Sequence, residues 1–335
     1  MTAVPDIVWL NLPLFIVGLI IIIKGSDLFL DSAVWVARAF GVPQIIIGAT
    51  IVSLCTTLPE LVSSCAASLK GSGDMALGNA VGSIFCNTGL ILGVVLLLIG
   101  ARIRREVFLI KGIFMLGGLL FGLFLVLPAH HETGLRIDRF EGLILLVFLV
   151  IFLVVNYYES LHMTGDAKLN KAEEDPARGD FSGWGKHMAC FMIGAVTVAI
   201  GAYMLVEFGQ RMALNFGVSE AVVSVLFVAL GTSLPELFTA IAAIRKKAQD
   251  ISVGNIFGAN VLNMALVVGA SATIRPLTPS DKLLARMDIP AALIVCSIVF
   301  FAGLIKGKLG KKTGLTLLGC YAVYTVVRLV MGRAG

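Results

Sequence analysis

Charged side chains are scarce in this sequence of 335 residues: they make up 14% of it, and hydrophobic residues make up 58%. Soluble domains carry about 25% charged residues. The mean hydropathy of +0.96 agrees with this scarcity, and together the values exclude a soluble protein. Apolar stretches long enough to cross a bilayer, about 20 residues each, fill most of the chain. No separate water-soluble domain fits in what remains.

Histidine and cysteine are also sparse, with four and six residues. The cysteines lie in apolar runs without CxxC spacing, which excludes a zinc site or a disulfide framework. No nucleophile–His–acid set, phosphate-binding loop or basic-aromatic stripe occurs, so neither an enzyme nor a nucleic-acid partner is indicated. The net charge of +5 needs no nucleic acid, because Lys and Arg beside membrane helices set the orientation of those helices.

The apolar segments predict ten transmembrane helices, because a backbone exposed to lipid must satisfy its own hydrogen bonds. Lys and Arg, including Lys111, are more frequent in the loops on one side, which places these loops in the cytoplasm and both termini outside. The hydrophilic stretch 163–186 indicates a cytoplasmic linker between a first half, 1–162, and a second half, 187–335. The predicted spans are 7–29, 43–69, 74–100, 107–128, 140–160, 187–208, 218–244, 250–273, 288–305 and 313–332.

An internal repeat is the most informative feature of the sequence. Residues 41–93 align with residues 217–269 at a constant offset of 176, without a gap, and 19 of the 53 positions are identical. Five crossings per half is an odd number, so the second copy is upside down relative to the first. The sequence therefore predicts an all-α membrane protein with two inverted five-helix repeats, the plan of many secondary transporters.

Glu60 and Glu236 are the only acidic residues in the middle of predicted spans. A charged side chain at mid-membrane costs on the order of 2.5–3.5 kcal/mol on insertion scales, so such residues usually mark an ion path or a proton relay. The alternative is a structural carboxylate paired with a buried base. No Lys or Arg lies at a matching depth, which favours the ion path.

Each of these glutamates directly follows a proline, Pro59 or Pro235. Proline lacks an N–H group and clashes with the carbonyl four residues earlier, which predicts that helices 2 and 7 are broken. A simple proline kink is the alternative. Hydroxyl residues precede both Pro-Glu pairs, and this doubled arrangement favours an unwound segment that gathers oxygen atoms. The hydroxyl residues are Thr56, Thr57, Thr232 and Ser233.

The next helix in each half carries a polar stripe with a spacing of four residues, which predicts a face turned inward. Such side chains can also serve only as hydrogen bonds between helices. Two carboxylates among hydroxyl, amide and freed carbonyl oxygens, without a His or Cys stripe, describe a site for a hard cation such as calcium, which takes 6–8 oxygens, or sodium. The stripes consist of Asn79, Ser83 and Asn87 in the first half, and Asn255, Ala259 and Asn263 in the second.

The segments 55–60 and 78–87, with their counterparts 231–236 and 254–263, resemble the two alpha-repeats of the sodium/calcium exchanger family, in the cation/calcium exchanger superfamily. The specific motifs cover 53 residues per half, and the short linker resembles that of bacterial inner-membrane members. The resemblance implies a ten-helix inverted repeat. Its second, third, seventh and eighth helices would surround a site at the middle of the membrane.

The resemblance also implies roles for single residues. Glu60 and Glu236 would ligate calcium and sodium, with further oxygens from Thr56 and Thr232. Sodium positions and the remaining ligand ring would be formed by Thr57, Ser83, Ser233, Asn87 and Asn263.

The sequence departs from the family pattern at three places. Cys55 stands where the motif usually has Gly, and Ala259 replaces the serine expected opposite Ser83. Asn263 occupies a position where some members, including potassium-dependent ones, have Asp. Its neutral side chain argues against potassium dependence.

The expected function is therefore sodium-driven calcium export by alternating access, in a bacterial inner membrane, with no cofactor and no obligatory protein partner. The expected partners are the two transported ions and the lipid bilayer. Three alternatives stay open: a calcium/proton antiporter, because buried glutamates also bind protons; a membrane enzyme that uses the glutamates as acid and base; and a passive channel. The repeat makes the two glutamates alike, which disfavours an acid–base pair, and the hydroxyl-rich surroundings favour sodium over protons.

Overall fold

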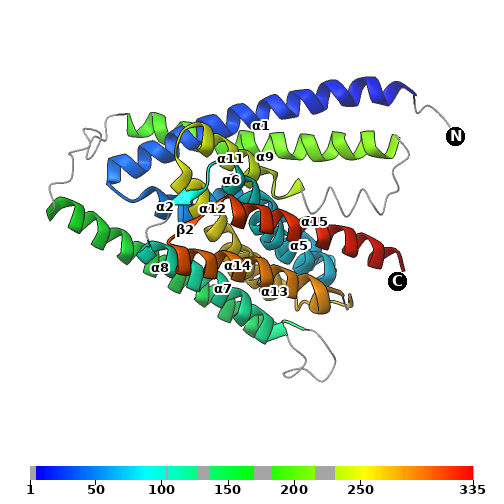
Figure 1. The fold of residues 1–335 in the computed structure, drawn as a ribbon. Coiled ribbons are helices and arrows are strands. Elements are labelled where there is room, and N and C mark those ends of the chain that lie inside the picture. Colours follow the sequence, from blue (N-terminus) through cyan, green and yellow to red (C-terminus); the bar gives the residue numbers. More distant parts are fainter. Residues whose placement is uncertain are drawn as a thin grey trace.

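The chain folds into helices and one short pair of strands in the computed structural model (Figure 1). The structure describes residues 5–102, 105–126, 136–169, 183–215, 231–281 and 283–334. Within these ranges seven helical segments are long and apolar enough to cross a membrane, or eight when the bent pair Gln44–Thr56 and Leu58–Leu69 counts as one span. The predicted class, an all-helical membrane protein, is confirmed.

The first half has helical segments at each of its predicted spans, and two of these spans are divided into short α-helical and π-helical pieces. Its elements are α1 (Pro5–Phe40), α2 (Gln44–Ile47), η1 (Gly48–Val52), α3 (Ser53–Thr56), α4 (Leu58–Leu69), α5 (Gly73–Phe85), η2 (Cys86–Leu92), α6 (Gly93–Leu98), β1 (Ala101–Arg102), α7 (Arg105–Val126) and α8 (Arg139–Leu169).

The second half has the same pattern, and β2 pairs antiparallel with β1 of the first half. The predicted span 218–244 is described only from residue 231 onward. The elements of this half are α9 (Trp184–Asn215), α11 (Leu234–Arg245), α12 (Gln249–Leu262), η4 (Asn263–Val268), α13 (Gly269–Ile274), η5 (Leu284–Asp288), α14 (Ile289–Lys306), β2 (Lys308–Leu309) and α15 (Lys311–Ala334).

Helix α1 is longer than the predicted span 7–29, because hydropathy marks only the part of a helix that suits lipid. The carboxylates of Asp27 and Asp31 pair with Arg245 and Lys246, at 3.4 and 2.6 Å, which supports the helix beyond its apolar part. It ends before Gly41, whose φ of 65° is a left-handed conformation that favours glycine. Helices α8 and α9 also extend beyond their predicted spans.

Helices α1 and α9 lie side by side at one edge of the molecule (Figure 1). A Cβ atom on Gly25 would lie 2.9 Å from the backbone nitrogen of Val198, and one on Gly201 would lie 2.6 Å from that of Ile22. These distances admit only glycine, which lets two membrane helices approach closely. Among the described elements, α2, α3 and α11 connect this pair to the other helices.

Helix α12 lies at the centre of the molecule and is the most deeply buried of the membrane-length segments. It packs backbone to backbone against α2 and η1 of the first half. A Cβ atom on Gly254 would lie 2.1 Å from the carbonyl oxygen of Ile45, and one on Gly258 would lie 2.2 Å from that of Ala49. This close approach brings the two repeated segments of the sequence together.

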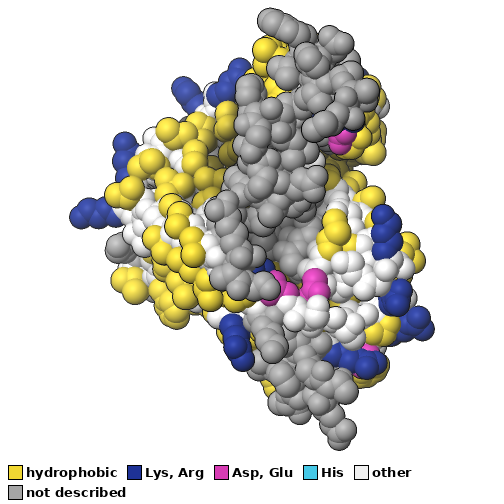
Figure 2. All heavy atoms as spheres, turned by 90° about the vertical axis from the view of Figure 1, so that its right-hand side faces the viewer, with side chains coloured by type: hydrophobic (Ala, Val, Ile, Leu, Met, Phe, Trp, Pro, Cys, Tyr) yellow, Lys and Arg dark blue, Asp and Glu magenta, His cyan; other side chains and the backbone are white. Residues whose placement is uncertain are grey.

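Large hydrophobic side chains are exposed along the outer helices. Their spacing of three or four residues marks one helix face, and patches of this kind are rare on soluble proteins. Figure 2 shows hydrophobic side chains over much of one side of the molecule, with Lys and Arg at its margins. Lipid is the solvent that suits this surface. Examples are Val147, Val150 and Val154 in α8, and Ile193, Val196 and Ile200 in α9.

Lys111 does not lie in a cytoplasmic loop, contrary to the expectation from the loop charges. It lies within α7, is 1% exposed, and pairs with Glu159 and Asn156 of α8. A buried ammonium group requires such partners, because burial without them is strongly unfavourable. Lys111 therefore joins two helices and contributes nothing to the loop charge that sets orientation.

Candidate cation site

The first repeat changes direction just before its glutamate. The segments Gln44–Thr56 and Leu58–Leu69 are bent by 45°, and Pro59 is the second residue of α4. In the second repeat Pro235 is the second residue of α11, and Ser233 precedes that helix. Each glutamate therefore lies in the first turn of a helix, where backbone N–H groups favour negative charge.

The carboxylates of Glu60 and Glu236 are both completely buried. They lie close enough to interact electrostatically, and none of their four oxygens has a hydrogen-bond partner in the described part of the chain. Two carboxylates without partners are unfavourable in a medium of low dielectric constant. A bound cation between them would supply the missing charge and the missing contacts.

Hydroxyl groups face both carboxylates, and each carboxylate meets a hydroxyl of the opposite half. The hydroxyls of Ser83 and Thr232 face Glu60, and that of Thr56 faces Glu236. The repeats thus contribute to one shared site rather than to two separate ones. A hydroxyl oxygen is a ligand that both calcium and sodium accept.

The four other predicted ligands are also buried polar groups. The hydroxyls of Thr57 and Ser233, and both amide groups of Asn87 and Asn263, have no hydrogen-bond partner within the described ranges. The two asparagines lie in the π-helical segments η2 and η4, a rare conformation that is frequent at functional sites. Orphaned buried oxygens of this kind suit a ligand or ordered water.

Two further asparagines contact the site, although the sequence indicated only a polar stripe there. Thr56 donates its hydroxyl hydrogen to Oδ1 of Asn255 over 3.2 Å, and Thr232 donates to Oδ1 of Asn79 over 3.2 Å. Both bonds join the two halves. The signal for them was present, because Asn79 and Asn255 are identical at the offset of 176, but their partners depend on the folded arrangement.

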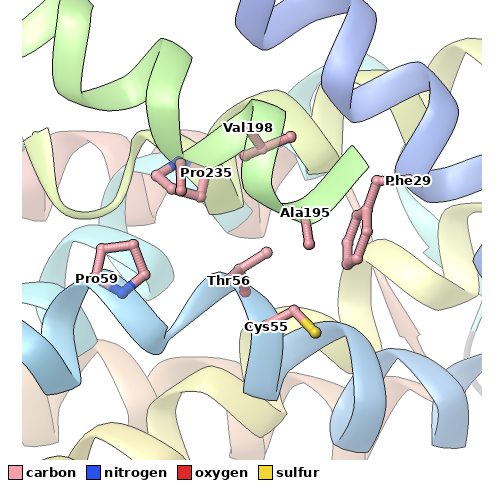
Figure 3. Close-up of a pocket in the computed structure, with 8 residues that line it drawn as sticks. Phe29, Cys55, Thr56, Pro59, Ala195, Val198 and Pro235 are labelled. Carbon is pink, nitrogen blue, oxygen red and sulfur yellow. The ribbon is translucent and has the colours of Figure 1, made fainter. Parts of the chain in front are cut away.

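A small cavity lies between the α1–α9 pair and the broken segments. It has about 10 Å³ of space for the centre of a water molecule, enough for about one water. Figure 3 shows the side chain of Thr56 between the labelled prolines and the residues of α1 and α9. The cavity is lined by Phe29, Cys55, Thr56, Pro59, Ala195, Val198, Ala199 and Pro235.

Cys55 and Ala259, two of the three departures from the family pattern, differ in their exposure. Cys55 is half-buried and lines this cavity, whereas Ala259 is completely buried in α12. In the described residues no three His, Cys, Asp or Glu side chains form a group that could hold a metal. A cation at this site would therefore rely on two carboxylates and on neutral oxygens, which suits calcium and sodium better than transition metals.

Two buried carboxylates beside a bent helix pair and buried oxygens without partners, in a helical membrane protein, are typical of the class of ion transporters. The sequence pattern of the sodium/calcium exchanger protein family matches residues 10–158 and 186–330. The chain belongs to this family. It is accordingly a membrane transporter rather than an enzyme, and the family's exchanged ions are sodium and calcium.

Individual relatives agree with the family match. The inner membrane protein YrbG of Escherichia coli strain K12 is 33% identical over 319 residues, which are 93% of this chain and 94% of that protein. The sodium/calcium exchanger MaX1 of Methanosarcina acetivorans is 28% identical and covers 95% and 98% of the two chains. A solved structure of the sodium-calcium exchanger NCX_Mj has a TM-score of 0.80 at 24% identity and covers 94% and 98%, which shows a shared fold.

Proposed function

We propose that this chain exchanges sodium for calcium at one site in the middle of the membrane. The observation that carries the proposal is the pair of buried carboxylates, Glu60 and Glu236, without a counter-ion among the described residues. Calcium would neutralise both charges. Thr56 and Thr232 would add oxygens to the calcium ligands, and sodium ions would use the same acids together with Thr57, Ser83, Ser233, Asn87 and Asn263.

The proposed frame is ten transmembrane helices in two inverted repeats, 1–162 and 187–335, joined by the cytoplasmic linker 163–186. Helices 2 and 7 would be broken at Pro59 and Pro235. Support comes from the 19 identities between the repeats. Five predicted crossings per half, an odd number, would invert the second copy. Both termini would lie outside the cytoplasm, in a bacterial inner membrane, as the loop charges and the named location of YrbG suggest.

The charge of the site predicts that the exchange is electrogenic. With both glutamates ionised, one calcium ion leaves the site neutral, whereas more than two sodium ions leave it positive. Exchange would then move net charge, which is worth about 2.3 kcal/mol per elementary charge at 100 mV. Sodium entry driven by the membrane potential would export calcium.

Access to the site would alternate by movement of the α1–α9 pair against the other helices. The pair is joined by close glycine contacts, as between Gly25 and Val198, and a small cavity lies between it and Thr56. It would therefore move as one unit. The ion pairs of Asp27 with Arg245 and of Asp31 with Lys246 tie α1 to the end of α11 on the proposed cytoplasmic side.

Flux measurements with independent gradients test this proposal. Purified protein in sealed vesicles is expected to take up calcium when sodium is loaded inside, and to be indifferent to potassium because Asn263 is neutral. Calcium flux driven by a pH step without sodium would identify a calcium/proton antiporter instead. Vesicles without protein are the control, and calcium uptake that ignores both sodium and pH contradicts antiport.

The substitution Ala259→Ser tests the placement of one sodium position. It restores the hydroxyl expected opposite Ser83, so the sodium concentration for half-maximal exchange is expected to fall by about threefold while calcium affinity stays within about twofold. The measurement is calcium uptake at varied sodium and at varied calcium. Equal changes in both affinities would refute this placement.

A further inference from the structure

Two of the hydrogen bonds between the repeats are equivalent, with a threonine as donor and an asparagine as acceptor in each direction. Thr56 of the first half donates to Asn255 of the second, and Thr232 of the second half donates to Asn79 of the first. Both asparagines are at least nine-tenths buried. Each threonine is one of the residues that face a glutamate carboxylate of the opposite half.

The direction of these bonds matters, because a threonine hydroxyl has a single hydrogen and two lone pairs. If the hydroxyl donated this hydrogen to a carboxylate, the hydrogen would compete with the cation for that carboxylate oxygen and would lie close to the cation's positive charge. When the hydroxyl donates its hydrogen to an asparagine oxygen, the lone pairs of the hydroxyl oxygen stay available to the cation. In the structure each threonine hydroxyl lies 3.2 Å from an asparagine Oδ1, and the oxygens of Glu60 and Glu236 have no hydrogen-bond partner among the described residues.

We propose that Asn79 and Asn255 are positioning residues of the cation site. Each accepts the hydroxyl hydrogen of a threonine from the opposite repeat and so turns the lone pairs of that threonine toward the ion. Neither asparagine ligates the ion itself. This inference rests on the proposed function, since it assumes that the two threonines ligate the transported cation.

The amide groups of the two asparagines differ in the further hydrogen bonds that hold them in place. Nδ2 of Asn79 donates to Oγ of Ser64 over 2.9 Å and to the carbonyl oxygen of Glu60 over 3.4 Å, which fixes the amide. In the second repeat Ala240 stands at the position of Ser64, and Nδ2 of Asn255 has no partner in the described ranges.

Each threonine has a second possible partner, so the threonines do not distinguish the two halves. Thr56 has the carbonyl oxygen of Ser53 at 3.3 Å, and Thr232 has the hydroxyl of Ser83 at 3.4 Å. The difference lies in the asparagine amides, of which only that of Asn79 is held by further hydrogen bonds. Matched substitutions of the two asparagines should therefore weaken calcium binding by different factors.

Calcium binding to the purified full-length protein, measured by titration calorimetry in detergent, tests the inference. Asn79→Ala is expected to weaken calcium binding about tenfold and Asn255→Ala about threefold. Ala240→Ser, which gives Asn255 the partner that Asn79 has, should strengthen binding. Asn260→Ala is the matched control: Asn260 is buried in the same helix as Asn255 but donates to Thr88 over 2.7 Å, so calcium binding should not change.

A double-mutant cycle separates positioning from a general structural effect. Thr232→Val removes the hydroxyl that Asn79 orients, so adding Asn79→Ala to it should weaken binding by less than about twofold. Additive losses in the double variant, or an equal loss in Asn260→Ala, would overturn the inference. The unfolding temperature of each variant shows that it is folded. If the wild type binds no calcium at all, the proposed function is wrong. If the wild type binds calcium and the losses in the double variant are additive, only the positioning role is wrong.

Discussion

Glu60→Gln and Glu236→Gln are each expected to abolish calcium transport while leaving the protein folded. Each substitution keeps the size of the side chain and removes one of the two charges that calcium would require. Breaking one partner of a buried charged contact costs about 3–5 kcal/mol, which corresponds to a loss of calcium affinity of at least about a hundredfold. The loss should be similar for both variants, because each carboxylate is completely buried and faces a hydroxyl of the opposite half.

The fold should tolerate these substitutions better than the function does. In the absence of cations the two carboxylates are buried near one another without partners among the described residues, so removing one charge relieves repulsion. The unfolding temperature in calcium-free detergent is therefore expected to stay equal or to rise, while the rise that calcium causes in the wild type disappears.

Vesicle flux and thermal unfolding together check this prediction. Glu141→Gln is the matched control: Glu141 accepts a hydrogen bond from the backbone of Asp138 at the start of α8, outside the proposed site, and transport should persist in this variant. Calcium uptake at the wild-type rate in Glu60→Gln would show that the carboxylate is not a ligand. Loss of folded protein in both variants, with the control intact, would point to a structural role of the glutamates.

Much of the helical architecture follows from the sequence, because lipid leaves few alternatives to a helix. Long apolar runs without charge can bury their backbone groups only in helices, and the predicted spans 74–100 and 250–273 agree closely with the segments Gly73–Leu98 and Gln249–Ile274. The repeat offset located both Pro-Glu pairs. It also placed Asn79 and Asn255 at equivalent positions before any contact was known.

Polar side chains within helices are where sequence reasoning is weakest. A lone charge near the end of an apolar run usually lies outside lipid, which predicts a loop position for Lys111, but Glu159 and Asn156 of α8 allow its burial. Helix α1 continued past its apolar part because Asp31 pairs with Lys246. Both partners lie far away in the sequence, so only the folded arrangement identifies them. The same holds for the bonds between Thr56 and Asn255 and between Thr232 and Asn79.

The residues that correspond to Asp31 and Lys246 in the other repeat do not form an ion pair with each other in this structure. At the offset of 176, Asp31 corresponds to Glu207 and Lys246 corresponds to Lys70. Glu207 instead pairs with Arg211 of its own helix at 2.5 Å. In an inverted repeat the two ends of the transporter exchange conformations during alternating access. Under the proposed alternating access, the contact of Asp31 with Lys246 would break and a contact of Glu207 with Lys70 would form.

Linking Asp31→Cys to Lys246→Cys with a short thiol-specific bridging reagent is therefore expected to stop exchange almost completely. The bridge would keep α1 on the end of α11, and the site would stay closed to the cytoplasm. The native side chains are 63% and 26% exposed, so both positions admit a reagent. Calcium uptake before bridging, after bridging and after reduction is the measurement, and reduction should restore it.

Two controls make the cross-link specific. Each single-cysteine variant, treated in the same way, should continue to transport, which excludes effects on the six native cysteines. The pair Lys70→Cys with Glu207→Cys should bridge more slowly than the cytoplasmic pair, because the counterpart contact is not formed in this conformation. If the bridged Asp31→Cys/Lys246→Cys protein exchanges calcium at the unbridged rate, α1 need not leave α11 during transport. The α1–α9 pair would then not be the moving unit.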